Sequence, residues 1–560
     1  MRKKTTRYSL KIFLSLTLFL AVVVVVAMVT VRTRARPQWQ QKVEDWVLEE
    51  AGAADEVEFL VVLKDQADLG RISDRLSKAE KGAAVYNSLT DVALRSQASL
   101  IPDLKAAGAD YRPFWISNMI WVRGDRALVE SLAGRPDVAH IAANPVVKLD
   151  LLPEQATANS SAQDSAVEWN IALVQAPNVW AEGIDGSGVV IGGQDTGYDW
   201  QHPALMNQYR GWDGQSASHT YNWYDAIHED NPNTPPGNPC GFDSPQPCDD
   251  QGHGTHTMGT MVGQDGAENQ IGMAPGAQWI ACRNMEQGWG TPATYAECYQ
   301  WFVAPYPQDG DPFSDGDPTK APHVINNSWS CPAGEGCVDP EVLSDVVNNV
   351  RAAGIVTVHS AGNNGYLGCG TINEPAAMYD SSFSVGATDR YDEIASFSSR
   401  GPSAQDDGLI IKPEISAPGV SVRSSIPGDS YGDKSGTSMA APHVAGLVAL
   451  LIDAQPALAG KVDLLESLIQ DTALRLYTDQ GCGDDSSQSI PNNSYGWGRI
   501  DAYSAYEAAA ALPTPSPTPS PTPSTTPVFT STPPPMGTPT PTSTMVIPVN
   551  EMYIPTWFRP

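Results

Sequence analysis

The chain contains few basic residues. Lysine and arginine account for only 34 of its 560 residues, against 64 aspartates and glutamates, which gives a formal net charge of −30 at pH 7. A surface of this charge repels phosphate groups, so duplex nucleic acid and anionic membrane surfaces are excluded as main partners.

Several metal-binding patterns are also missing. None of the 8 cysteines stands in a Cys-x-x-Cys pair, and the chain contains neither a His-Glu-x-x-His motif nor an EF-hand spacing. We therefore expect no cofactor to be required for catalysis. The even number of cysteines permits disulfides, and Cys240 with Cys248 and Cys331 with Cys337 are close enough to close short loops. The full pairing is left open, as is the alternative of free buried thiols.

Basic residues flank a long apolar run at the N-terminus. The run covers residues 12–31, and no small-x-small cleavage site follows it. Its length suits a bilayer-spanning helix, so residues 1–37 are predicted to be either a signal peptide or an uncleaved signal anchor in the membrane. In both cases the remainder is secreted or held on the extracellular face of the cell envelope, where disulfides persist.

From about residue 55 to residue 150, short apolar strand patterns alternate with helical spacing. Strand patterns occur at 57–63, 114–116, 119–122 and 138–141, and helical patterns at 92–107 and 127–132. This order predicts a small α+β module of the split βαβ type. The tripeptide Arg123-Gly124-Asp125 is interpreted as a chance match rather than an adhesion motif. Residues 151–167 are small and polar, which predicts an extended, protease-accessible linker.

Three residues further along the chain have the chemistry of acyl transfer. Asp195 ends an apolar strand on a glycine turn, a position that places a carboxylate at the carboxyl edge of a parallel sheet. His253 and His256 lie on a run of small residues that can open a helix; one is a candidate base, with metal ligation as the weaker alternative. Ser438 follows a glycine turn at the start of an apolar helix, whose free N–H groups can stabilise an oxyanion.

These residues supply the three roles that a serine nucleophile requires. A hydroxyl must lose its proton to a base, an imidazole titrates near neutral pH, and a carboxylate orients the imidazole. The order Asp195, His253, Ser438 matches the subtilisin arrangement. We expect no Gly-x-Ser-x-Gly nucleophile elbow, which disfavours an α/β-hydrolase. His443 is expected to be a packing residue, and Asp249 with Asp250 a solvated acidic loop.

On these motifs, residues 166–511 resemble the subtilases, in particular their bacillopeptidase F-like branch. Further matching segments are 272–277, 360–363 and 396–402. The resemblance implies a three-layer subtilisin-like α/β fold with a mostly parallel sheet between helices. It also implies that Asp195, His253 and Ser438 are the catalytic triad, and that the side-chain amide of Asn363 binds the oxyanion. The substrate-binding residues that it implies are Ser328, Trp329, Ser330 and Gly362, with Trp329 making the local surface aromatic.

The resemblance also gives a role to the flanking segments. It implies that residues 38–165 are a ferredoxin-like propeptide that inhibits its own protease, that the zymogen cleaves itself within 151–167, and that a structural calcium ion is permitted, although no ligands are nominated. The Pro/Thr/Ser-rich residues 512–544 are predicted to form an extended stalk, followed by a short tail, 545–560. The predicted function is a serine endopeptidase acting on protein substrates; an exopeptidase and a catalytically silent binding protein are the alternatives.

Overall fold

The computed structural model describes residues 36–513, except 153–166, 267, 404 and 406–409. The apolar run at 12–31, most of the predicted linker, the stalk and the tail lie outside the described residues.

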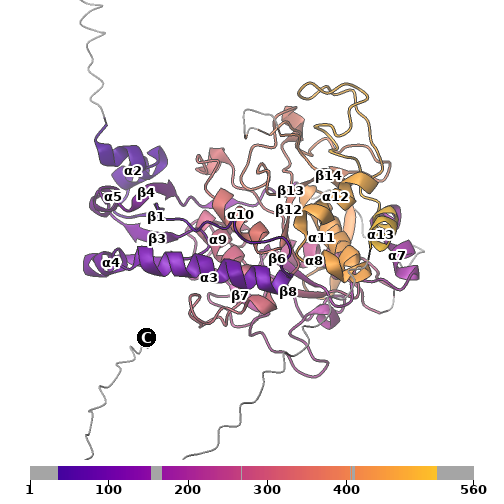
Figure 1. Ribbon diagram of the computed structural model, residues 1–560, viewed down its shortest axis with the longest axis horizontal. Helices are drawn as coiled ribbons and strands as arrows, with labels where there is room; N and C mark the ends of the chain where they lie inside the picture. The colour runs from indigo at the N-terminus through magenta and orange to yellow at the C-terminus, as the bar shows by residue number, and fades with distance from the viewer. Residues whose placement is uncertain (1–35, 153–166, 267, 404, 406–409, 514–560) are drawn as a thin grey trace, which may run out of the picture. The chain divides into compact units, whose positions relative to one another are not determined.

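The N-terminal module is a four-stranded antiparallel sheet covered by helices (Figure 1). Its strands are β1 (Val57–Leu63), β2 (Asp110–Phe114), β3 (Met119–Gly124) and β4 (Val138–Ala143), in the order β2-β3-β1-β4. Its helices are α2 (Asp45–Ala53), α3 (Lys78–Gln97), α4 (Ile101–Ala107) and α5 (Arg126–Ala133), after the 3₁₀ turn η1 (Gln38–Lys42). The predicted order of strands and helices is confirmed, but two bounds differ: the helix expected over 92–107 is two helices, α3 and α4, and the strand expected at 114–116 lies at Asp110–Phe114.

Helix α3 begins well before the predicted residue 92. A capping box explains the earlier start: the Glu80 N–H donates to Ser77 Oγ at 3.3 Å, and the Ser77 N–H donates to the Glu80 carboxylate at 2.8 Å. The two side chains satisfy donors that the first helical turn leaves free, so the helix can start there although the apolar spacing is weak.

The second part of the chain is built on a seven-stranded sheet in which every pair of neighbours is parallel. The strand order is β14-β13-β12-β11-β6-β8-β7. Their bounds are β6 Val190–Asp195, β7 Trp223–Asp225, β8 Gln278–Arg283, β11 Val324–Asn327, β12 Val356–Ser360, β13 Phe383–Thr388 and β14 Ile415–Pro418. Because the strands are parallel, their carboxyl ends share one edge, where ligand sites of such sheets lie.

Helices cover both faces of this sheet (Figure 1). On one face α8 (His253–Val262) and α11 (Thr437–Ala454) bury Met258 and Leu447 against Val358; on the other, α9 (Pro292–Val303) and α10 (Ser344–Ala352) pack with Ile325. The remaining helices are α6 Trp169–Leu173, α7 Ala176–Ala181, α12 Val462–Thr472 and α13 Ala502–Ala510. The predicted three-layer α/β fold is confirmed.

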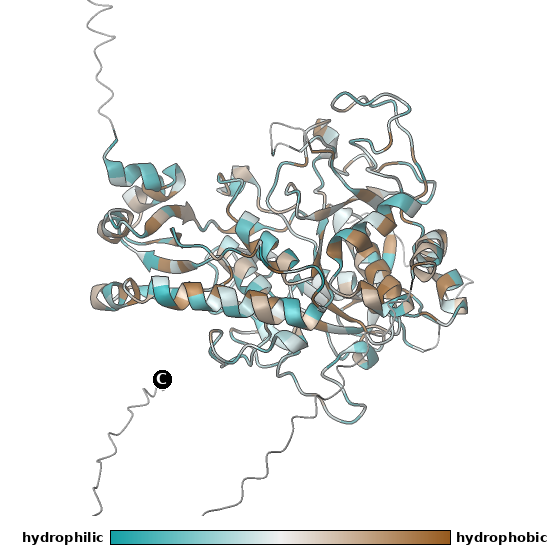
Figure 2. Ribbon diagram, viewed as in Figure 1, coloured by the Kyte–Doolittle hydropathy of each residue, from teal (hydrophilic) through white to brown (hydrophobic). Residues whose placement is uncertain are grey.

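Helix α11 is the central core helix. It is long and apolar enough to cross a membrane, but 89% of it is buried inside the protein, and Figure 2 shows it as brown over most of its length. Both its faces therefore contact other parts of the fold, as a fully apolar helix in a globular protein requires.

The N-terminal module packs directly on the part of the chain that contains the seven-stranded sheet. Helix α3 contacts α10 and the 3₁₀ turn η3 (Pro318–Lys320). The Gln300 side-chain oxygen Oε1 accepts the Trp115 N–H at 2.7 Å, and the Asn349 side-chain amide donates to the Ile116 main-chain carbonyl at 2.6 Å. Leu60 and Trp115 belong to the same apolar core as α9 and α10. This continuous core makes the interface more than a set of surface contacts.

All eight cysteines are paired. The disulfides are Cys240–Cys248, Cys282–Cys298, Cys331–Cys337 and Cys369–Cys482. The two short loops suggested by the sequence are among them, whereas the other two pairs join segments that the sequence could not match.

Candidate active site

Asp195 and His253 meet at the carboxyl edge of the parallel sheet. Asp195 is the last residue of β6, and His253 is the first residue of α8. The His253 Nδ1–H donates to the Asp195 carboxylate, with Nδ1 at 2.8 Å from Oδ1 and 3.0 Å from Oδ2. Both side chains are buried, at 0% and 1% exposed. A carboxylate on Nδ1 holds the proton there and leaves Nε2 free to accept one.

His256 has a different environment. Its ring is fully buried, and the Nε2–H donates to the main-chain carbonyls of Val422 at 3.0 Å and Gly432 at 3.1 Å. Burial lowers the pKa of His256 well below its usual value. Of the two histidines, His253 therefore has the geometry of a base. Within the described residues, no group of three or more His, Cys, Asp and Glu side chains is arranged to hold a metal ion.

Ser438 is the second residue of α11. The preceding Gly436 has φ 151°, a conformation that other residues rarely adopt. The Ser438 hydroxyl donates to the Ser328 carbonyl at 3.3 Å, and the Ser328 hydroxyl donates to the Ser438 carbonyl at 3.1 Å. Pro442 explains the second bond: proline has no N–H, so the Ser438 carbonyl lacks its helical partner four residues later.

Asn363 lies beside the start of the same helix. Its Oδ1 accepts two hydrogen bonds from Thr437, one from the main-chain N–H and one from the hydroxyl, both at 3.0 Å. Because these bonds hold the carbonyl side of the amide, the NH₂ group is presented on the opposite side. There it donates to the main-chain carbonyl oxygen of Asp150 at 3.2 Å.

The chain's own residues 147–150 lie beside this site as an extended segment. Strand β5 (Val147–Lys148) pairs antiparallel with β10 (Trp289–Gly290), which pairs with β9 (Met285–Glu286). The Leu149 N–H continues the pairing by donating to the Gly288 carbonyl at 2.7 Å. Residues 147–150 are therefore bound as an added strand, the way many proteins bind extended peptides.

The predicted substrate-binding residues have unequal surroundings. Ser328 contacts Ser438 as described, and the Gly362 N–H donates to the Thr437 hydroxyl at 3.1 Å. Trp329 is only 2% exposed, and its ring stacks on Tyr295 with ring centres 3.9 Å apart. The expectation that Trp329 makes the local surface aromatic is therefore wrong: the indole faces inward, since a covered ring gains more from burial than an exposed one.

Acidic side chains surround Asp150. The Asn364 amide donates to Glu374 at 3.0 Å, and Glu335 accepts the Lys148 main-chain N–H at 2.7 Å. Burial raises the pKa of Glu374, and the carboxylates of Asp150 and Glu335 raise it further, while a hydrogen bond from Ser330 opposes them. The sequence analysis missed Glu374, because nothing local distinguishes it from a surface glutamate.

Gly193 and Gln194 precede Asp195 at the end of β6. The Gln194 amide donates to Asn327 at 2.5 Å and accepts from Asn284 at 3.0 Å, all within the protein interior. A side chain at Gly193 would place Cβ 2.4 Å from the Tyr198 hydroxyl. The strand end is thus supported by a buried polar network in which both the NH₂ group and the oxygen of the Gln194 amide have partners.

Two expectations about neighbouring residues are settled by contacts. The His443 Nδ1–H donates to the Met439 carbonyl at 2.9 Å, and the Asn170 amide donates to its Nε2 at 2.8 Å, so His443 is a buried packing residue. The expectation that the chain lacks Gly-x-Ser-x-Gly is wrong, since residues 428–432 match it. That match lies at the turn between β15 (Val422–Ile426) and β16 (Ser430–Lys434), and its serine opens the second strand of this hairpin rather than a helix, so it is not a nucleophile elbow.

The expected solvated acidic loop is also corrected. Asp249 and Asp250 are both partly buried, and each accepts hydrogen bonds from the protein. Consecutive acidic residues are usually exposed to solvent, so the sequence did not predict that hydrogen-bond donors of the folded chain surround these two carboxylates.

Comparisons with known proteins agree with this geometry. Residues 186–498 match the model of the subtilase family. The chain is 36% identical to Bacillopeptidase F of Bacillus subtilis (strain 168) over 501 residues, which cover 84% of this chain but only 32% of that protein. It therefore spans about a third of that relative. Subtilisin Savinase of Lederbergia lenta is 33% identical over 292 residues, covering 52% of this chain and 86% of the relative.

A third relative gives the same result. Subtilisin E of Bacillus subtilis (strain 168) is 30% identical over 333 residues, covering 59% of this chain and 70% of the relative. The family model, the parallel sheet and the hydrogen bond between His253 and Asp195 agree with one another. The chain belongs to the subtilase family of serine endopeptidases.

Proposed function

We propose that the chain is the zymogen of a serine endopeptidase that hydrolyses proteins through Asp195, His253 and Ser438. Ser438 Oγ attacks the substrate carbonyl carbon while His253 Nε2 takes its proton, and the same proton is then given to the leaving amine. A water molecule then attacks the carbonyl carbon of the acyl group while His253 Nε2 takes its proton, and Ser438 Oγ leaves with that proton. Asp195 holds the imidazole in the required tautomer and stabilises its charged form.

The oxyanion that forms in this reaction needs donors already in place. The Asn363 NH₂ group and the Ser438 N–H are the proposed donors, and the two bonds from Thr437 to Asn363 keep the amide oriented. Fixed donors need no reorganisation during the reaction, which is why each contributes several kcal/mol to stabilising the transition state. No cofactor takes part in this mechanism, and a structural calcium ion stays a prediction.

The contact between Asn363 and the Asp150 carbonyl, at 3.2 Å, is the observation that carries the proposal. It supports the interpretation that residues 147–150 lie as a substrate does, with Asp150 as the residue before the cleaved bond. We therefore propose self-cleavage between Asp150 and Leu151, at the edge of the range 151–167 expected from the sequence. Residues 38–150 are the proposed propeptide, which stays docked as an inhibitor through its interface with the peptidase part.

The proposed location is outside the cytoplasm. Four disulfides in the described residues are compatible with an oxidising compartment. Residues 1–37 are proposed to direct export, as signal peptide or membrane anchor, and residues 512–544 to act as a stalk, followed by the tail 545–560.

N-terminal sequencing of the purified full chain tests this function. Wild type is expected to yield a new N-terminus at Leu151, whereas Ser438→Ala should stay uncleaved. Ser430→Ala is the matched control, because it removes the serine of the Gly-x-Ser-x-Gly segment and should process like wild type. Equal cleavage in wild type and Ser438→Ala would refute self-processing, and a different new N-terminus would refute the assignment of Asp150.

A further inference from the structure

Asp249 collects hydrogen bonds from both sides of the catalytic pair. Its Oδ1 accepts from the Thr196 hydroxyl at 2.9 Å, from the Gln251 N–H at 3.1 Å and from the Gly252 N–H at 2.7 Å. Its Oδ2 accepts from the Thr255 N–H at 3.0 Å and from the Thr255 hydroxyl at 2.6 Å. A carboxylate that accepts this many bonds is tightly held, since charge-assisted hydrogen bonds are stronger than neutral ones.

These donors belong to the two segments that carry the catalytic acid and base. Thr196 directly follows Asp195, and Gly252 and Thr255 lie on either side of His253. The Thr196 hydroxyl also accepts the Gly254 N–H at 3.1 Å, which completes a ring of hydrogen bonds between the end of β6 and the start of α8. The negative charge at the first turn of α8 is further favoured by the helix dipole.

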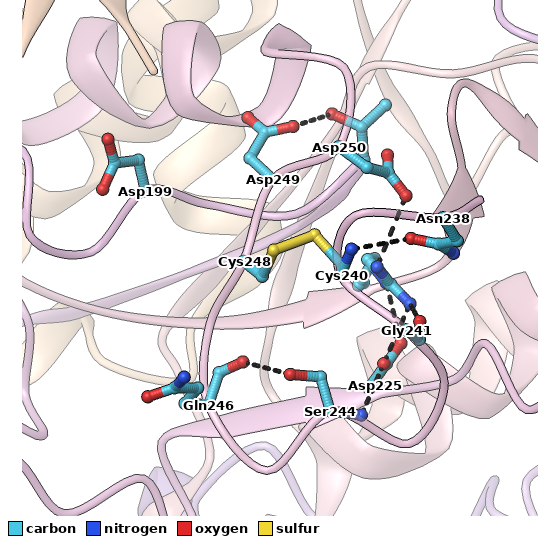
Figure 3. The surroundings of a disulfide bond; sticks show 12 residues. Asp199, Asp225, Asn238, Cys240, Gly241, Ser244, Gln246, Cys248, Asp249 and Asp250 are labelled. Atoms are coloured by element: carbon cyan, nitrogen blue, oxygen red, sulfur yellow. Dashed lines mark hydrogen bonds and ion pairs between the residues drawn. A yellow bond between two sulfur atoms is a disulfide. The ribbon is translucent and has the colours of Figure 1, made fainter. Parts of the chain in front are cut away.

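The segment that carries Asp249 is itself closely packed. Asp249 follows Cys248, which is bonded to Cys240 (Figure 3), and the Tyr198 N–H donates to the Cys248 carbonyl at 3.1 Å. A Cβ added at Gly197 would lie 1.8 Å from the Cys248 carbonyl oxygen. Because the backbones of Gly197 and Cys248 are in contact, the carboxylate of Asp249 is held in one position relative to the end of β6.

We propose that Asp249 is a positioning residue that sets the alignment of Asp195 with His253. It touches neither the substrate nor the reacting atoms; it acts through Thr196 and through the first turn of α8. The inference rests on the proposed function, since it requires Asp195 and His253 to work as acid and base partners. A small misalignment of such a pair lowers the rate strongly: a shift of about 1 Å can cost about 100-fold.

The test measures the first-order rate of self-cleavage in the full chain. Because the cleaved segment is already bound, this rate reports the chemical step without substrate binding. Asp249→Asn is the test variant, because the NH₂ group of the asparagine cannot accept hydrogen bonds from the N–H and hydroxyl groups that the carboxylate binds. Asp250→Asn is the matched control: the neighbouring Asp250 carboxylate accepts from Arg283 at 3.3 Å and from the Gln287 N–H at 2.9 Å, not from Thr196 or Thr255.

Asp249→Asn is expected to lower the rate about 100-fold, and Asp250→Asn to leave it unchanged. The pH at which the rate reaches half its maximum should move to lower pH in Asp249→Asn, because a misaligned carboxylate stabilises the imidazolium less. Thr196→Val removes the hydroxyl that donates to Asp249 and should also lower the rate. Thr196→Ser keeps a hydroxyl at this position and should restore the rate. This Thr196 pair decides the question if Asp249→Asn fails to fold.

Unchanged rates in folded Asp249→Asn or in Thr196→Val would overturn the inference. So would an equal loss in Asp250→Asn, which would indicate a general effect of the loop on stability. Cleavage that persists in Ser438→Ala would refute the proposed function instead, so the two failures are distinguishable.

Discussion

Replacing Asn363 by alanine removes two interactions of different kinds. One is the hydrogen bond from its NH₂ group to the Asp150 carbonyl at 3.2 Å, which in the proposed mechanism becomes the bond to the oxyanion. The other is the acceptor for the Thr437 N–H and hydroxyl, both at 3.0 Å. The first loss affects the reaction rate, and the second affects the stability of the start of α11.

The two losses can be sized separately. Removing one oxyanion donor costs about 2.7 to 4 kcal/mol, which corresponds to a rate lower by about 10² to 10³. Leaving the buried Thr437 N–H without a partner costs about 1 to 3 kcal/mol of stability. Asn363→Asp separates them, because it keeps an oxygen for Thr437 and loses the donor. We expect both variants to cleave themselves at least about 100-fold more slowly, and only Asn363→Ala to lose thermal stability.

The assay is the rate of appearance of the cleaved form after folding, followed by gel or intact mass. Thermal unfolding is measured in the Ser438→Ala background, so that cleavage does not change the sample. A rate for Asn363→Asp within about tenfold of wild type would refute the assigned role of the amide. A lower Tm for both variants would refute the separation of the two functions.

Three further predictions concern charge and crosslinks. Burial alone would lower the pKa of His228, but the carboxylates of Glu297 and Asp243 raise it to about 9. The ion pairs of the protonated His228 therefore stabilise the fold fully below pH ~6.5, and this contribution is lost as the pH rises through about 9. In Ser438→Ala, the change His228→Gln should lower the Tm clearly at pH 6 and little at pH 9.5. The Cys369–Cys482 disulfide closes a separation of 113 residues, so changing both cysteines to serine should cost about 4 to 5 kcal/mol in the loop-entropy model. With Glu374 beside the residue before the cleaved bond, the mature enzyme should prefer peptides with lysine or arginine there over those with aspartate at pH 8.5, and Glu374→Gln should reduce the ratio of kcat/KM values about tenfold.

Each of these outcomes can fail in a recognisable way. A Tm difference between wild type and His228→Gln that is equal at both pH values would contradict the ion pair. If loss of Cys331–Cys337, with a separation of 6 residues, cost more than loss of Cys369–Cys482, the entropic explanation would be wrong. A preference for lysine or arginine over aspartate that survives undiminished in Glu374→Gln would exclude the charge of Glu374 as the determinant.

The sequence predicted the framework of the fold for a physical reason. Strand 57–63 and the turn before Ser438 follow local rules of alternation and of glycine conformation, which need no knowledge of distant neighbours. The Asp195–His253 contact could be anticipated because parallel strands end at one edge. These parts of the site depend on local sequence and on topology alone.

The predictions that failed near the site concern the directions in which side chains point. Trp329 lies in the predicted segment but faces Tyr295, and Asp249 lies in an acidic run but faces converging N–H donors. Glu374 gains its importance from Asn364 and Asp150, which approach it only in the folded chain. Which way a side chain points depends on tertiary packing, and no periodicity in the sequence encodes it.

Labelling with a fluorophosphonate probe tests the central claim most directly. The mature form, freed of residues before 151, is treated with the probe, digested and mapped by mass spectrometry. The account predicts a single modified serine, Ser438, with no labelling of Ser438→Ala and normal labelling of Ser430→Ala. Modification of another serine, or none in a folded and processed chain, would contradict it.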